Sequence, residues 1–134
     1  MNILFICKWN RFRSKVAEAI FNKLNKNPSN KAKSAGLIAG SPLDKDILNA
    51  AKKFELKLPR KRQGLSHKLL MWADEIIIVA SDVPISIFED IKNNDKKKIV
   101  NWNIVDYYGH DNTHREKLIE SIKSKIELLL KEIS

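Results

Sequence analysis

One stretch near the N-terminus decides the fold: residues 3–14 read ILFICKWNRFRS. Its first part, residues 3–6, is a continuous apolar run, which is typical of a strand buried on both faces of a parallel sheet. The polar residues 7–14 follow, and an amphipathic helix is predicted over residues 15–24. A buried strand, a short polar loop and a helix are the layout of a phosphate-binding turn, in which backbone N–H groups converge on an anion.

The residue types in this loop suit phosphoryl chemistry. We expect Cys7 to be a nucleophilic thiolate, because converging N–H groups and a helix N-terminus stabilise negative charge. Arg13 carries a planar guanidinium that can bind two phosphoryl oxygens at once. Two readings of Ser14 stay open, since its hydroxyl can donate to the Cys7 sulfur or cap the helix. The alternative is a buried structural cysteine beside a solvated arginine, and the strand, loop and helix context argues against it.

The same loop resembles that of the low-molecular-weight protein tyrosine phosphatases, which reads Cys-x-x-Asn-x-x-Arg-Ser before a helix containing Ala-Glu-Ala. Cys7, Asn10, Arg13 and Ser14 stand at those positions, and residues 17–19 read Ala-Glu-Ala. The resemblance covers most of the chain and continues in Ser34-Ala35-Gly36, Gly40, Pro42, Asp44, Ser66-His67 and Asp106-Tyr107-Tyr108-Gly109. It implies a cofactor-free hydrolase of phosphomonoesters, acting on phosphotyrosine in proteins through a phosphocysteine intermediate and releasing inorganic phosphate.

Roles for single residues follow from the resemblance. The expected catalytic residues are Cys7, Arg13 and Asp106, with Asp106 as general acid and base and Asp111 as its rival. The expected substrate-binding residues are Lys8, Trp9, Asn10, Arg11, Phe12, Ser14, Tyr107 and Tyr108. Ser34 and His67 are expected behind the loop, where His67 and Asn10 hold its conformation; a surface position at a helix start is the other reading of His67. Asp82 follows a strand at the catalytic edge, where a site role is open to it, and capping of a helix ahead of Pro84 is the preferred interpretation.

Three departures from the family pattern bear on substrate and rate. Trp9 stands where many members have Gly, Phe12 stands where many have a second Cys, and no Pro follows Asp106. They keep two alternatives open: a phosphate or phosphoprotein-binding module without turnover, and a phosphatase for phosphoarginine or small phosphomonoesters such as aryl phosphates. Arsenate reduction is disfavoured because it generally needs further cysteines.

Length and composition narrow the class of protein. With 134 residues and 43% hydrophobic residues, we expect one domain over residues 1–134 and no membrane span, which would need about 20 consecutive apolar residues. The single cysteine excludes an intramolecular disulfide, and the three histidines show no metal-ligand spacing. The N-terminus enters a predicted strand almost at once, so we expect no signal peptide and a cytoplasmic protein.

A formal net charge of +9 raises nucleic acid as a partner. Most lysines are scattered, however, and the basic clusters are confined to residues 57–62 and 96–98. Clusters of this size are usually solvated loops that can attract acidic, phosphorylated proteins, so binding of nucleic acid is disfavoured.

Alternating strands and helices predict an α/β fold with three layers. Strands are predicted at residues 3–6, 31–35, 75–80 and 98–102; helices are predicted at 15–24, 44–54, from 66, at 84–91 with Ile87, Phe88 and Ile91 inward, and after a capping box at 113–116. A parallel sheet in the order 2-1-3-4 places the first strand at the topological switch point. Residues 7, 34, 82 and 106 then gather at one sheet edge.

Overall fold

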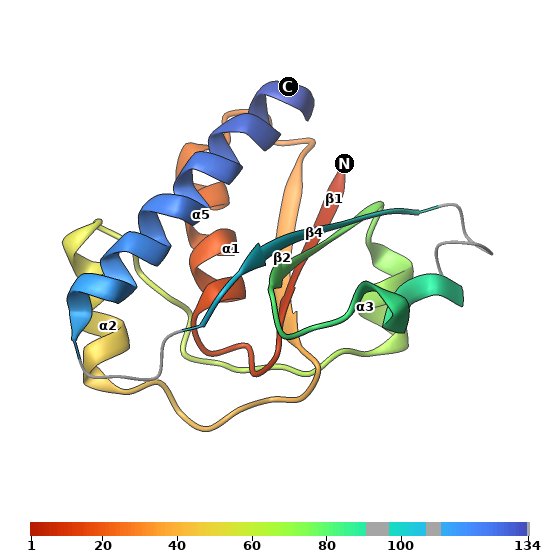
Figure 1. The fold of residues 1–134 in the computed structure, drawn as a ribbon. Coiled ribbons are helices and arrows are strands. Elements are labelled where there is room, and N and C mark those ends of the chain that lie inside the picture. Colours follow the sequence, from red (N-terminus) through yellow and green to blue (C-terminus); the bar gives the residue numbers. More distant parts are fainter. Residues whose placement is uncertain (91–96, 107–110, 134) are drawn as a thin grey trace.

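Four parallel strands form one sheet in the computed structural model, which describes residues 1–90, 97–106 and 111–133 (Figure 1). They are β1 (Asn2–Cys7), β2 (Lys31–Gly36), β3 (Glu75–Ala80) and β4 (Lys98–Ile104), in the order β2-β1-β3-β4. Every residue of β3 is buried, as are the last five of β1, which explains their continuous apolar sequences. The predicted strands and their order are confirmed.

Helices cover both faces of this sheet (Figure 1). One face carries α1 (Arg13–Leu24), α2 (Lys45–Lys53) and α5 (Asn112–Ile133), and the other carries α3 (His67–Trp72) and the 3₁₀ turn η1 (Ile85–Phe88). Neighbouring residues of β1 therefore enter different cores, because side chains alternate along a strand. Phe5 packs in the α1 and α5 core, whereas Ile6 packs in the α3 core. Cys7, the last residue of the strand, departs from this alternation and also packs in the α3 core.

Two predicted helix details are wrong. The long helix begins at Asn112, one residue before the expected cap Thr113, because Asp111 accepts the Thr113 N–H at 2.9 Å and so takes the capping role. In the predicted helix over residues 84–91, η1 buries Phe88 but leaves Ile87 50% exposed, since a 3₁₀ turn has a different period from an α-helix. Ile91 lies outside the described residues.

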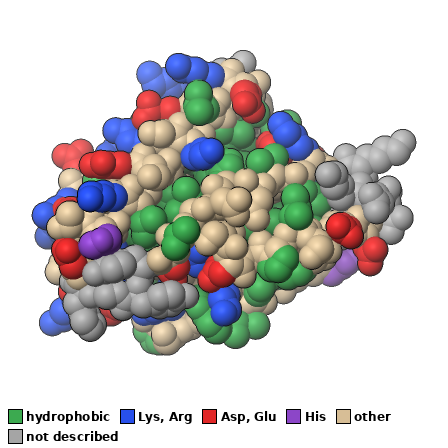
Figure 2. Space-filling view, in the orientation of Figure 1, with side chains coloured by type: hydrophobic (Ala, Val, Ile, Leu, Met, Phe, Trp, Pro, Cys, Tyr) green, Lys and Arg blue, Asp and Glu red, His purple; other side chains and the backbone are tan. Residues whose placement is uncertain are grey.

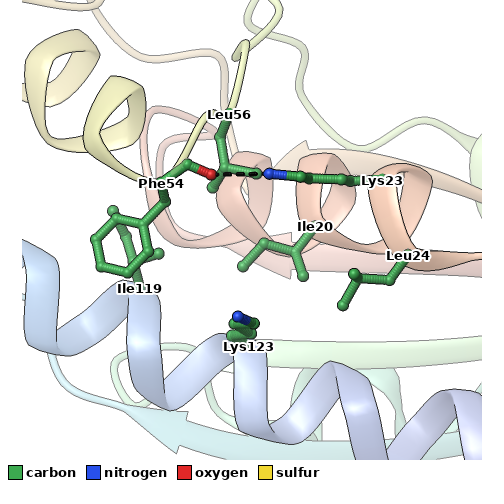
Figure 3. Close-up of a pocket in the computed structure, with 7 residues that line it drawn as sticks. All are labelled: Ile20, Lys23, Leu24, Phe54, Leu56, Ile119 and Lys123. Carbon is green, nitrogen blue, oxygen red and sulfur yellow. Dashed lines mark hydrogen bonds between the residues drawn. The ribbon is translucent and has the colours of Figure 1, made fainter.

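A small hollow remains between α1, the end of α2 and α5 (Figure 3). Its volume is about 60 Å³, and its lining is mainly apolar: Ile20, Lys23, Leu24, Phe54, Leu56, Ile119 and Lys123. The Lys23 ammonium lies at its border and donates to the Phe54 carbonyl at 3.1 Å. This face of the core is therefore held by apolar contacts that do not fill all of the available space.

Charged side chains of both signs are interspersed over the face that includes α5, rather than gathered in one field (Figure 2). The scattered distribution expected for most of the lysines is visible there. None of the helices among the described residues has the length and apolarity that a membrane crossing requires.

Candidate active site

Cys7 is the last residue of β1 and lies at the edge where the strands end. Its side chain is only 2% exposed, and its Sγ atom lies 3.0 Å from Ser14 Oγ. Helix α1 begins at Arg13, and Phe12 occupies the cap position without a side-chain hydrogen bond. The capping role considered for Ser14 is therefore wrong, and its hydroxyl contacts the sulfur instead.

Asn10 organises the inside of the loop. It is fully buried with a left-handed backbone (φ 54°), a conformation that asparagine tolerates better than most residues. Its Oδ1 accepts the Gln63 N–H at 2.9 Å, so its Nδ2 must be the donor to Ser14 Oγ at 2.9 Å and Ser34 Oγ at 3.0 Å. Because Ser14 accepts from Asn10, its own hydrogen is available for the sulfur. The Ser14 hydroxyl is therefore placed to donate to the Cys7 sulfur.

Ser34 continues the network away from the sulfur. Its hydroxyl donates to Glu18 Oε1 at 2.7 Å. Burial raises the pKa of Glu18, and the hydrogen bond from Ser34 opposes that rise. Ser34 thus connects Asn10 of the loop with Glu18 of the Ala-Glu-Ala segment.

Glycines let the neighbouring chain approach the back of the loop. A Cβ atom at Gly36 would lie 2.7 Å from the Asn10 nitrogen, and one at Gly40 would lie 2.8 Å from the Trp9 Cβ. The Gly40 N–H also donates to the Trp9 carbonyl at 2.8 Å. A larger residue at Gly36 would therefore force the loop backbone to move.

Arg13 is 2% exposed and is held from three sides. Its Nη1 donates to the Ile104 carbonyl at 2.9 Å, and its Nη2 lies 3.1 Å from Asp82 Oδ1 and 3.5 Å from Asp106 Oδ2. The interpretation of Asp82 as a helix cap is wrong, because its carboxylate faces the guanidinium and η1 has no side-chain cap. Asp82 and Asp106 together orient the arginine toward the loop.

The two candidate acids differ in their surroundings. Asp106 is 17% exposed and adjoins Arg13. Asp111 is 57% exposed at the start of α5, where hydrogen bonds from Thr113, first from its backbone N–H, hold the pKa of Asp111 below its usual value. The predicted neighbours Tyr107 and Tyr108 lie outside the described residues.

The other predicted loop residues divide into two groups. Lys8 and Trp9 are half-exposed at the mouth, with the Lys8 ammonium 5.1 Å from the centre of the Trp9 ring. The Phe12 side chain packs in the core, and the Arg11 guanidinium donates to the Ser41 carbonyl at 3.0 Å and adjoins Asp44. The side chains of Phe12 and Arg11 are therefore engaged with the protein. The group that these two residues can offer an anion is the backbone N–H.

A hollow of about 300 Å³ opens beside the Trp9 ring. It is lined by Trp9, Arg11, Ala39, Gly40 and Ser41. It lies next to the loop because Gly40 and Trp9 are joined by a backbone hydrogen bond.

A family model for low molecular weight phosphotyrosine protein phosphatases matches residues 2–134. The chain belongs to this family. No match is found among curated protein sequences.

Solved structures share the fold of this phosphatase chain. The YwlE arginine phosphatase from Geobacillus stearothermophilus is 19% identical, with a TM-score of 0.83 over 98% of this chain and 92% of that chain. A low molecular weight protein tyrosine phosphatase from T. tengcongensis is 25% identical, with a TM-score of 0.79 over 99% of both chains. An arsenate reductase from Archaeoglobus fulgidus is 23% identical, with a TM-score of 0.74 over 96% and 98%. The fold is thus common to proteins named for different activities.

Sequence reasoning missed two residues of this candidate site, Gln63 and Lys15, and preferred a different role for a third, Asp82. Asp82 contacts Arg13, the Gln63 N–H holds Asn10, and Lys15 is 1% exposed and donates to the Lys61 carbonyl. The place of Asp82 directly after a buried strand was the one available signal. His67, by contrast, is exposed as the first residue of α3 and makes no hydrogen bond to Asn10 among the described residues.

Proposed function

We propose that residues 1–134 act as one phosphatase domain that hydrolyses phosphotyrosine in proteins through a phosphocysteine intermediate. The observation that carries this proposal is the buried hydrogen-bonded chain from Asn10 through Ser14 to the Cys7 sulfur. Because Asn10 donates to Ser14, the Ser14 hydroxyl is placed to donate to the sulfur, as a nucleophilic thiolate requires. Arg13 lies at the same sheet edge to receive the phosphoryl group.

The first step transfers the phosphoryl group to the enzyme. The phosphate monoester binds to the loop N–H groups and Arg13, next to Asp106, which enters this step as the carboxylic acid. The Cys7 thiolate attacks phosphorus, so the S–P bond forms while the bond from phosphorus to the phenolic oxygen breaks. Asp106 gives its proton to the departing oxygen.

The second step regenerates the enzyme. The Asp106 carboxylate accepts a proton from water as that water attacks phosphorus, and the S–P bond breaks to return the Cys7 thiolate. Inorganic phosphate leaves with the oxygen of the water. Ser14 serves both steps, because its hydroxyl stabilises the sulfur anion that attacks first and departs second.

The mouth of the site supports an aryl phosphate. Trp9 presents a half-exposed ring beside the hollow that Ala39, Gly40 and Ser41 complete. A tyrosine ring held by its phosphate can pack against this indole with favourable aromatic geometry. A guanidinium would also stack on the Trp9 ring, so the arginine phosphatase of similar fold makes phosphoarginine the competing substrate.

The experiment measures phosphate release from p-nitrophenyl phosphate and from matched phosphotyrosine and phosphoarginine peptides. The wild type should hydrolyse the aryl phosphate and the phosphotyrosine peptide, and Cys7→Ser should hydrolyse neither. During turnover the wild type should also carry one phosphoryl group on Cys7, which acid quenching traps, whereas Cys7→Ala should carry none. These two readouts separate catalysis by Cys7 from contaminating phosphatase.

Two results would redirect the proposal. Phosphate binding without turnover in either protein identifies a binding module, and a higher kcat/KM on the phosphoarginine peptide identifies an arginine phosphatase.

We also place the activity in the cytoplasm, where reducing conditions keep a lone nucleophilic thiol active.

A further inference from the structure

We propose that residues 57–62, called the basic loop below, form a docking surface for acidic residues that flank the phosphorylated residue of a protein substrate. This inference rests on the proposed phosphatase activity and names the class of protein that the site selects. The basic loop reads KLPRKR, with four cations in six positions.

Its charges are displayed to solvent while its backbone is held. Lys57, Arg60 and Lys61 are exposed, and their side chains have no hydrogen bond or ion pair within the described part of the chain. Leu58 is 5% exposed and packs in the core. The loop therefore presents uncompensated positive charge from a backbone that the core anchors, and such a surface attracts carboxylates.

Three hydrogen bonds fasten this region to the site. The Gln63 N–H, directly after the basic loop, donates to Asn10 Oδ1 at 2.9 Å. Arg62 Nε donates to the Gly40 carbonyl at 3.3 Å, and the Lys15 ammonium donates to the Lys61 carbonyl. The first turn of α1, the phosphate loop and the hollow beside Trp9 are thus each tied to the basic loop. A peptide with its phosphate beside Cys7 has the basic loop within reach of its neighbouring residues.

The use of Lys15 shows how firmly the loop is held. An ammonium that is 1% exposed loses its hydration, which disfavours the charged form. Burial accordingly lowers the pKa of Lys15, Glu18 opposes this, and the charge of Arg62 adds to it. A buried cation used to hold a main-chain carbonyl indicates that the position of the basic loop matters to the site.

Acidic protein fits this surface better than nucleic acid. Proteins that bind single strands combine positive charge with aromatic faces for base stacking, and the basic loop has no aromatic residue. Its cations also occupy one short loop rather than a long groove. A few carboxylates next to the phosphorylated residue of a protein would cover a surface as short as the basic loop.

The test compares Arg60→Gln/Lys61→Gln with the wild type on two phosphotyrosine peptides of equal length. One peptide has Asp and Glu around the phosphotyrosine, and the other has Asn and Gln. The double variant should lose about three- to tenfold in kcat/KM on the acidic peptide, through KM, because steering and rim charges act mainly on association. On the neutral peptide and p-nitrophenyl phosphate it should stay within twofold.

The matched control is Lys125→Gln/Lys131→Gln, which removes two exposed charges from the distant half of α5. This control should keep the wild-type kcat/KM on the acidic peptide. Raising the ionic strength should narrow the gap between the two peptides for the wild type and not for the basic-loop variant.

Equal losses on both peptides, or the same loss in the control, overturn the docking role. So does a single-stranded oligonucleotide that binds the wild type more tightly than the acidic peptide and not the basic-loop variant. If no aryl phosphate is hydrolysed, the proposed activity fails by itself. Anisotropy titrations of the two labelled peptides then decide the docking role, which requires tighter binding of the acidic one by the wild type alone.

Discussion

The two ends of helix α1 are built by different means. Its first turn buries Arg13, Ser14 and Lys15, and each polar side chain has a hydrogen-bond partner. Its second half buries Ile20 and Phe21 by apolar contact beside a hollow of about 60 Å³ (Figure 3).

The difference shows which contacts must be directional. A buried polar group without its partner costs about 1–3 kcal/mol, so the first turn tolerates little rearrangement. Apolar contacts have no required direction, and the second half can leave space unfilled at modest cost. Conservative changes at the two ends should therefore separate catalysis from stability.

The largest effect is expected for Arg13→Lys at the polar end. One ammonium cannot replace the guanidinium contacts to the Ile104 carbonyl and Asp82 while also holding two phosphoryl oxygens. We expect kcat/KM on p-nitrophenyl phosphate to fall by about 10³, or about 4 kcal/mol of barrier. Arg115→Lys makes the same change at another buried arginine and should stay within threefold. Near-normal turnover by Arg13→Lys would refute the binding of two phosphoryl oxygens by the Arg13 guanidinium.

A smaller loss of activity is expected for Asp106→Asn. The carboxylate of Asp106 adjoins Arg13 at the polar end of α1. The kcat of this variant should fall by about 10², and the loss should grow as the leaving phenol becomes more basic, because such a phenolate depends most on a proton donor. Asp111→Asn keeps a capping side chain and should stay within threefold, since the lowered pKa of Asp111 favours its carboxylate. If only Asp111→Asn shows the leaving-group dependence, the acid is assigned to the wrong residue.

The smallest effect is expected for Ile20→Val at the apolar end. Removing one methylene beside the existing hollow should lower the free energy of unfolding by about 1 kcal/mol in urea titrations. The kcat/KM of the folded enzyme should remain within twofold of the wild type. A fall in kcat/KM of more than twofold in the folded Ile20→Val enzyme would mean that the two ends of α1 are coupled. The contrast between a catalytic end and a stabilising end would then be wrong.

Local pattern was sufficient to predict the fold. Runs such as residues 75–80 have a continuous apolar character that only a doubly covered strand explains, and the alternation with helices determined the order of the sheet. The errors lie in two helix details, the cap of α5 and the period of the turn η1. Asp111 caps α5 in place of Thr113, and Phe88 is buried where Ile87 remains exposed.

The site was predictable where its residues are contiguous. The spacing of Cys7 and Arg13 in one loop, together with the strand before it and the helix after it, indicates a phosphate site. The Gln63 N–H and the Asp82 carboxylate enter from segments 53 and 69 residues away from their partners Asn10 and Arg13. No local pattern marks the contact of Gln63, and the place of Asp82 after a buried strand does not reveal which residue it contacts. The burial of Lys15 was equally hidden, because its partner is a main-chain carbonyl that any residue could supply.

The hydrogen bond from Arg13 to the Ile104 carbonyl spans 91 residues of sequence. This hydrogen bond requires Ile104 in place, and therefore β4 paired with β3 at the edge of the sheet. Contacts of such long range form late in folding because the chain must first close a large loop. On the ribosome, Cys7 and its loop are made long before the strand that secures the guanidinium. Catalytic activity should therefore be acquired near the end of folding. Nascent and partly folded chains should not hydrolyse phosphorylated proteins.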